Sequence, residues 1–121
     1  MVGELDAARM LYDQGRALMD SGDLEASVER FRESSRIAPH FKTLELEGEC
    51  LLKLGRVSEA VIPLAAASTL NKGVRAVSFL AEAFARLNEG DRCKEMCEEA
   101  LRRDPSNKKA REIAESLTRA E

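Results

Sequence analysis

The segment DSGDLEA, residues 20–26, together with Phe31 and Pro39 downstream, decides the fold of this chain. Part of this segment recurs further along the chain. Gly22 and Gly55 are 33 residues apart, and each is followed by a Glu-Ala pair, at residues 25–26 and 59–60. A constant period of this size is the sequence signature of a stacked structural repeat. The rest of the chain is therefore best analysed as copies of one unit.

Other positions keep the same spacing of 33 residues. Small residues recur at Gly15, Gly48 and Ala81, where two helices must approach closely. Large apolar residues recur in the same phase: Leu11, Leu44 and Val77, then Leu18, Leu51 and Phe84, then Phe31 and Leu64. The chain thus divides into three units, at about 8–40, 41–73 and 74–107, followed by a helix-forming tail at about 107–120.

Each unit has the pattern of two helices. In the first unit, spacings of three and four place one set of residues on a common helical face: Leu11, Gln14, Gly15 and Leu18. Residues 20–23 break that pattern, and Pro39 ends the second helix. In the second unit we expect Pro63 to kink the second helix and Gly73 to stop it.

The tail has one apolar stripe and one charged face. The stripe consists of Ala110, Ile113, Ala114 and Leu117. Ser106, directly after Pro105, is the expected N-cap. A stack of repeats needs such a terminal helix, because its last unit otherwise exposes core side chains to water.

The composition limits the protein class. The chain has 121 residues, of which 44% are hydrophobic, 34% charged and only 4% aromatic. These values suit one helical domain with a modest core. The net charge of −3 argues against nucleic-acid binding, and no apolar run approaches the roughly 18 residues of a membrane span. Because the start shows no secretory leader, we expect the three cysteines to be reduced and the protein to be cytoplasmic.

These repeats resemble the tetratricopeptide repeat (TPR) family. The resemblance rests on residues 20–26 with Phe31 and Pro39, on residues 54–60, and on the unit ending at residues 100–105. It covers about residues 8–107. It implies an all-α, right-handed superhelical solenoid of three antiparallel helix pairs plus one capping helix, as a single domain over 1–121. Ser27, Ser34 and Ser35 stand where the family usually has Ala, so we expect looser packing in the first unit.

In this family the first helices of successive units line a concave groove that holds an extended or helical peptide. The resemblance assigns to this groove Arg9, Tyr12, Asp13, Arg16, Met19 and Asp20 from the first unit, Lys42, Glu45, Leu46, Glu49, Leu52 and Lys53 from the second, and Arg75, Ser78, Phe79, Glu82, Ala85 and Arg86 from the third. Helical phase turns Leu46, Leu52 and Phe79 away from the core stripe. We therefore expect an exposed apolar strip centred on Leu46 and Phe79, against the alternative that these side chains drape over their neighbours.

Charged positions also align across the units. Arg9, Lys42 and Arg75 are spaced by 33 residues and would form a row of cations able to grip acidic side chains of a partner. The equally weighted alternative is that Lys42 and Arg75 neutralise the C-terminal dipoles of the preceding helices. One branch of the family clamps the terminal carboxylate of heat-shock chaperones, and the aligned residues here are Tyr12, Arg16, Leu46, Arg75 and Phe79. Only Arg75 keeps the expected charge, which disfavours that clamp.

No set of residues predicts catalysis or metal binding. His40, the single histidine, falls at an expected turn, and no phosphate loop, HExxH or CxxC motif is present. Cys93 and Cys97 share a helical face, but a closed zinc site requires four ligands, so core packing is favoured.

The sequence thus predicts a non-enzymatic module without cofactor or metal. We expect it to bind a protein or peptide partner in its groove as a monomer, without nucleic acid or membrane. A structural or self-assembling scaffold that uses the solenoid ends, with weak self-association, is the alternative.

Overall fold

The computed structural model describes residues 3–120. Within this range the chain forms seven helices and no strand: α1 (Glu4–Asp20), α2 (Leu24–Ile37), α3 (Phe41–Lys53), α4 (Val57–Leu70), α5 (Arg75–Arg86), α6 (Gly90–Arg103) and α7 (Lys108–Ala120). The predicted all-α solenoid is confirmed. Met1 and Val2, which entered the argument against a leader, and Glu121 lie outside the described residues.

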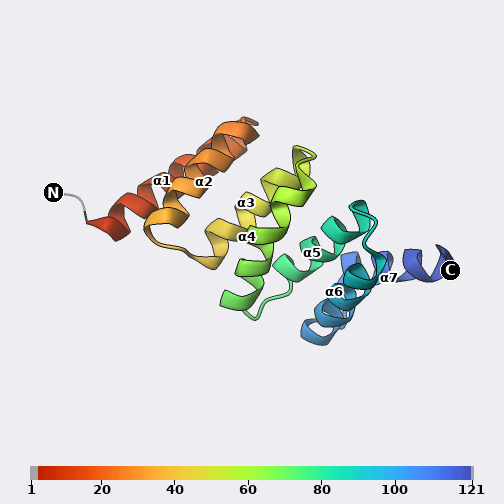
Figure 1. The fold of residues 1–121 in the computed structure, drawn as a ribbon. Helices are drawn as coiled ribbons and strands as arrows, with labels where there is room; N and C mark the ends of the chain where they lie inside the picture. The colour runs from red at the N-terminus through yellow and green to blue at the C-terminus, as the bar shows by residue number, and fades with distance from the viewer. Residues whose placement is uncertain (1–2, 121) are drawn as a thin grey trace.

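The helices are stacked in chain order (Figure 1). The most extensive contacts lie within the pairs α1–α2, α3–α4 and α5–α6. Each pair contacts the next through α2 with α3 and α4 with α5, and α7 covers both α6 and α5. Helix α3 also contacts α5 directly, whereas contact between α1 and α3 is at most marginal. None of the helices in residues 3–120 is both long and apolar enough to cross a membrane.

Glycine lets the paired helices approach in the first two units. A Cβ atom on Gly15 would lie 2.5 Å from the Phe31 ring, and one on Gly48 would lie 2.4 Å from Leu64. In the third unit the corresponding residues are Ala81 and Cys97, both buried. A larger residue on one helix is thus matched by a smaller one on its partner, as close packing requires. The predicted core role of Cys93 and Cys97 is confirmed by their burial.

Ser27 and Ser34 bind α2 to α1, so the expected looser packing is wrong for these two serines, whereas Ser35 Oγ is buried without a hydrogen-bond partner within the described residues. Ser27 Oγ donates to the Gly15 carbonyl oxygen at 2.8 Å, and Ser34 Oγ donates to that of Ala8 at 2.7 Å. Both serines are buried, and each bond ties α2 to α1. Cys93 Sγ makes the equivalent contact to the Ala81 carbonyl oxygen, at 3.3 Å.

Two expected helix boundaries are also wrong. Helix α4 already ends at Leu70, and Gly73 has no positive φ, so it does not form a left-handed C-cap. The tail helix is capped one residue later than expected, because Asn107 Oδ1 and not Ser106 accepts from the Ala110 amide. Helix α4 continues through Pro63. Gly22 and Gly55 do adopt positive φ at the turns inside their units.

Candidate functional site

Helix α3 lies at the centre of the predicted groove and is the most deeply enclosed helix. Nine of its thirteen residues are buried, including Leu46 and Leu52 at 6% and 4% exposure. The expectation that these two leucines are exposed is therefore wrong. Helical phase within one pair identifies only the side that faces the partner helix, whereas α5 also packs against α3 and covers a second side. Leu46 and Leu52 belong to the core cluster, and Phe79 is half-buried against it.

Buried carboxylates on α3 occupy the middle of the predicted cation row. Arg75 Nε lies 3.3 Å from Glu45 Oε1, and Arg75 Nη2 pairs with Glu49 Oε1. Lys42 Nζ lies 3.3 Å from Glu45 Oε1, and Lys53 Nζ lies 3.9 Å from Glu49 Oε2. Two of the three row cations thus have carboxylate partners within the protein, and within residues 3–120 neither side chain bonds a carbonyl oxygen at the end of the preceding helix.

The helix-end role belongs to Arg103, which the sequence did not single out. Its Nη1 donates to the carbonyl oxygens of Ser68, Asn71 and Gly73 at 3.0–3.2 Å. These carbonyls lie at and beyond the end of α4, where helical partners are missing. Arg103 therefore fixes the α4–α5 connection from α6.

In the α5–α7 part of the groove, the cationic side chains already contact groups of the protein itself. Phe79 has the Arg75 guanidinium 5.1 Å from its ring centroid and the Lys109 ammonium at 5.4 Å. Lys109 Nζ also lies 2.6 Å from Glu82 Oε1, and Arg86 Nη1 donates to the Leu52 carbonyl oxygen. Lys109 was missed at the level of sequence. The period could have pointed to this helix, since Lys108 lies 33 residues after Arg75 and the tail thus repeats a first helix.

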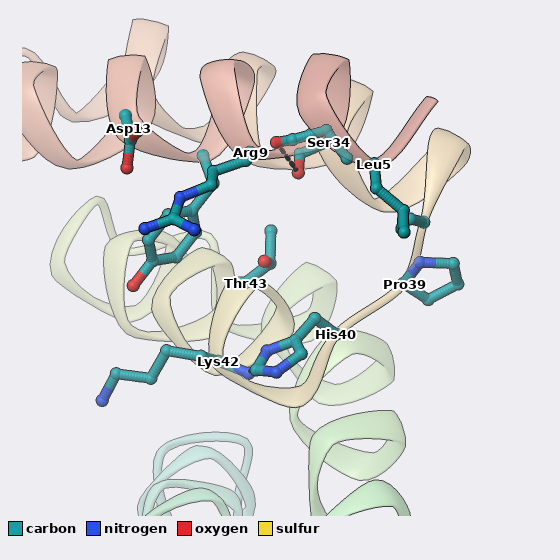
Figure 2. A pocket seen from close by; sticks show the side chains of 11 residues that line it. Leu5, Arg9, Asp13, Ser34, Pro39, His40, Lys42 and Thr43 are labelled. Carbon is teal, nitrogen blue, oxygen red and sulfur yellow. Dashed lines mark hydrogen bonds between the residues drawn. The ribbon is translucent and has the colours of Figure 1, made fainter. Parts of the chain in front are cut away.

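The α1–α3 part is open, and it holds a cleft of about 450 Å³ (Figure 2). One end of the cleft is apolar and is lined by Leu5, Ala8 and Pro39. Arg9 and Lys42 line it from opposite helices. Within residues 3–120 no carboxylate lies within ion-pair distance of Arg9.

Further polar groups line the same cleft. Thr43 is only 3% exposed, and within the described chain its hydroxyl has no hydrogen-bond partner. Tyr12 Oη accepts from Arg16 Nη1 at 3.1 Å, which leaves the phenol proton free to donate. His40 Nδ1 accepts from the Lys42 amide and caps α3, so the neutral ring carries its proton on Nε2. His40 thus has a structural task at the expected turn.

The thiols of this chain are poor nucleophiles and poor metal ligands. Burial raises the pKa of Cys50 and Cys93, and it raises the pKa of Cys97 to about 12. At neutral pH all three remain thiols, whereas nucleophilic attack and metal ligation require the thiolate. Within residues 3–120, no cluster of three or more His, Cys, Asp or Glu side chains is arranged to hold a metal ion.

Comparison with known proteins supports one repeat directly and the fold as a whole. The family model described as tetratricopeptide repeat matches residues 8–41. Comparison with curated protein sequences gives no significant match. The match confirms the resemblance drawn from residues 20–26, Phe31 and Pro39.

Solved structures of TPR domains superimpose over nearly the whole chain. The first TPR of Spaghetti (RPAP3), bound to an HSP90 peptide, is 18% identical, with 98% of this chain and 95% of that chain covered and a TM-score of 0.89. The second TPR domain of human RPAP3, in complex with an HSP70 peptide, is 19% identical, with 96% and 98% covered and a TM-score of 0.89. The Yersinia enterocolitica type III secretion chaperone SycD, in complex with a peptide of the translocator YopD, is 16% identical, with 93% and 92% covered and a TM-score of 0.84. This chain therefore has the TPR fold.

Proposed function

We propose that this chain, whose fold is that of TPR domains, is a non-catalytic module that binds a segment of a partner protein along α1, α3 and α5. The observation that carries the proposal is the open cleft between α1 and α3, which continues the face formed by the first helix of each pair. A cleft of about 450 Å³ has the size of a binding site for one or two side chains. Structural neighbours were determined with peptides bound, which supports the same class of ligand here.

The proposed contact residues are the predicted groove residues, with a changed role for the leucines. The residues accessible to a ligand are Arg9, Tyr12, Arg16, Lys42, Arg75, Phe79, Glu82 and Arg86, whereas Glu45 and Glu49 are buried and paired with Lys42 and Arg75. Leu46 and Leu52 lie beneath them as part of the core. Tyr12 and Phe79 are the half-buried aromatic side chains of this face and would supply its apolar contacts.

The side chains argue for binding without chemistry. His40 is engaged as a helix cap, and the three thiols are buried and protonated. A catalytic constellation needs a titratable group that can reach a bound substrate. The three unpaired cysteines also support a reducing compartment such as the cytoplasm.

A scaffold role is the second candidate, because α7 takes the position of a first helix and no later helix packs on it within residues 3–120. A shallow hollow lined by Leu101, Arg111, Ala114 and Thr118 is formed by α6 and α7. A self-assembling module would use this end. Its molar mass in light scattering would then rise with concentration, while the groove would remain free.

The groove proposal can be tested by mapping peptide binders. Peptides selected from a random 12-residue display library would be titrated into isotope-labelled protein and followed by NMR. We expect the amide signals of α1, α3 and α5 to shift, and Tyr12→Ala to weaken binding. Ile62→Ser on α4, which changes a side chain that is 78% exposed on a second helix, is the control and should bind normally. Shifts confined to α7 would instead support the scaffold.

A further inference from the structure

We infer that the cleft between α1 and α3 holds the carboxylate of an internal Glu or Asp side chain of the bound peptide, next to a large apolar side chain in the Leu5 end. The inference rests on the proposed function and specifies its ligand. It departs from the sequence expectation, in which all three cations of the row share the task.

Unsatisfied donors converge on this cleft. Arg9 has no carboxylate at ion-pair distance within residues 3–120, and Lys42 lines the same cleft from α3 (Figure 2). The Thr43 hydroxyl lines the cleft and has no hydrogen-bond partner within the described residues, and because its oxygen remains accessible to water it can donate to a ligand. The free protons of Tyr12 Oη and His40 Nε2 add two neutral donors. A carboxylate, with two oxygens that each accept more than one bond, can satisfy such a set.

The charges around the cleft also favour an anion. Lys42 belongs to a chain of three cations and two carboxylates, with Arg75, Lys53, Glu45 and Glu49, whose net charge is positive. Among the described residues, Asp13 is the one carboxylate that lines the cleft, and the charge of Arg9 offsets it. Lys42 is therefore left as the excess charge of the cleft.

The other cations of the groove are less able to do this. Arg75 holds two buried glutamates, and Lys109 holds Glu82. A ligand carboxylate at either position would have to displace an existing partner, whereas at Arg9 it displaces only water. The acidic group of the ligand is therefore placed at the N-terminal end of the groove.

The apolar end of the cleft sets the second requirement. Leu5 is 77% exposed although it is a large apolar residue, and it lies beside Ala8 and Pro39. A ligand side chain such as Leu or Phe would cover this surface. A single acidic residue without an apolar neighbour would leave that end open to water and should bind more weakly.

The test uses the whole chain and a random 12-residue library whose peptides are fused at their C-termini, so that no free terminal carboxylate is displayed. Selected sequences should be enriched in an acidic residue beside a large apolar one. Synthetic, C-terminally amidated copies should lose affinity about tenfold when that Glu is changed to Gln. The double variant Arg9→Gln/Lys42→Gln should lose about the same factor, and the loss should shrink at high salt.

Two further variants keep the test specific. Lys72→Gln/Lys94→Gln removes two exposed cations outside the cleft and should bind within twofold of the unaltered protein. Thr43→Val keeps the side-chain shape and should weaken binding without lowering the melting temperature. If peptides bind the groove equally well after Arg9→Gln/Lys42→Gln, or require a free C-terminus, this inference is wrong while the proposed function stands. If no selected peptide shifts groove signals, the proposed function itself fails.

Discussion

The first and third helix pairs are built on the same 33-residue template, yet their first helices have different surroundings. Helix α5 contacts both α3 and α7. Arg75 on α5 and Lys109 on α7 form ion pairs with glutamates of the groove. Helix α1 has only α2 as an extensive contact, and a cleft separates it from α3. The pairs also differ inside, where Phe31 over Gly15 is replaced by Cys97 over Ala81.

The difference shows that position in the stack, and not the repeat pattern, decides which residues are available to a partner. Arg9 and Arg75 occupy equivalent positions, but only Arg75 holds buried carboxylates. The third pair therefore resembles a closed part of the core, and the first pair resembles an open binding surface. Each prediction below tests one side of this contrast.

Removal of residues 107–121 should have the largest effect, because it gives α5 the exposed flank that α1 already has. Ala110 is buried, and Ile113 and Leu117 pack on the core cluster beside Phe84 and Cys97. Full burial of each large aliphatic side chain contributes about 1.5–3 kcal/mol, and a domain of this size has only about 5–15 kcal/mol in total. We expect the shortened chain to unfold or aggregate. A circular-dichroism melting temperature equal to that of the full chain would show that α7 is not a cap.

Phe84→Ala should cost about 3–5 kcal/mol, because it leaves a cavity beneath α6. Phe79→Ala should cost only about 1–2 kcal/mol, because that ring is half-buried and its additional contacts are the two cations above it. Chemical denaturation of the two variants gives the comparison. Equal losses would mean that Phe79 is a core residue and that the α5 part of the groove has no aromatic contact to offer.

Gly15→Ala should cost about 1–3 kcal/mol through overpacking against the Phe31 ring, partly offset by the better helix propensity of alanine. The double variant Gly15→Ala/Phe31→Cys reproduces the third pair in the first. Its loss of unfolding free energy should be smaller than the sum of the two single losses, since the added methyl group fills part of the space that Phe31 leaves. Strict additivity in denaturant titrations would show that the two positions do not determine the helix spacing.

Arg75→Gln should cost about 1–2 kcal/mol, because it leaves Glu45 and Glu49 buried with weaker compensation. The equivalent change Arg9→Gln should alter stability by less than about 0.5 kcal/mol, as is usual for an exposed residue. Melting temperatures of the pair measure the contrast between the closed and open parts directly. A larger loss for Arg9→Gln would indicate that Arg9 stabilises the fold and is not available to a ligand.

The smallest effect concerns Glu47, on the opposite side of α3. Burial raises the pKa of Glu47, and its bond to Arg32 only partly opposes this rise. Because the folded pKa lies above the unfolded one, Glu47 destabilises the protein at neutral pH, and this penalty disappears as the pH falls through the folded pKa. The melting temperature of the unaltered chain should therefore gain slightly on that of Glu47→Gln between pH 7 and pH 5. No pH dependence of the difference would contradict the raised pKa.

Several features followed from the sequence because they depend on residues close together in the chain. The period, the two helices per unit, the turns at Gly22 and Gly55 and the small residues between paired helices are local consequences of helical phase and backbone conformation. The apolar stripe of the tail likewise predicted its packing on the last pair. The sequence also placed the groove residues on the first helices, as a family pattern.

The availability of those residues was decided only by the tertiary structure. Leu46 and Leu52 are buried because a neighbouring pair packs on a second side of α3, and helical phase within one pair carries no information about that contact. The partners of Arg75 and Lys109 lie 26 and 27 residues away in the chain, so their neutralisation depends on how the pairs stack. The cleft beside Arg9 exists for the same reason, since α1 and α3 do not close on each other as α3 and α5 do.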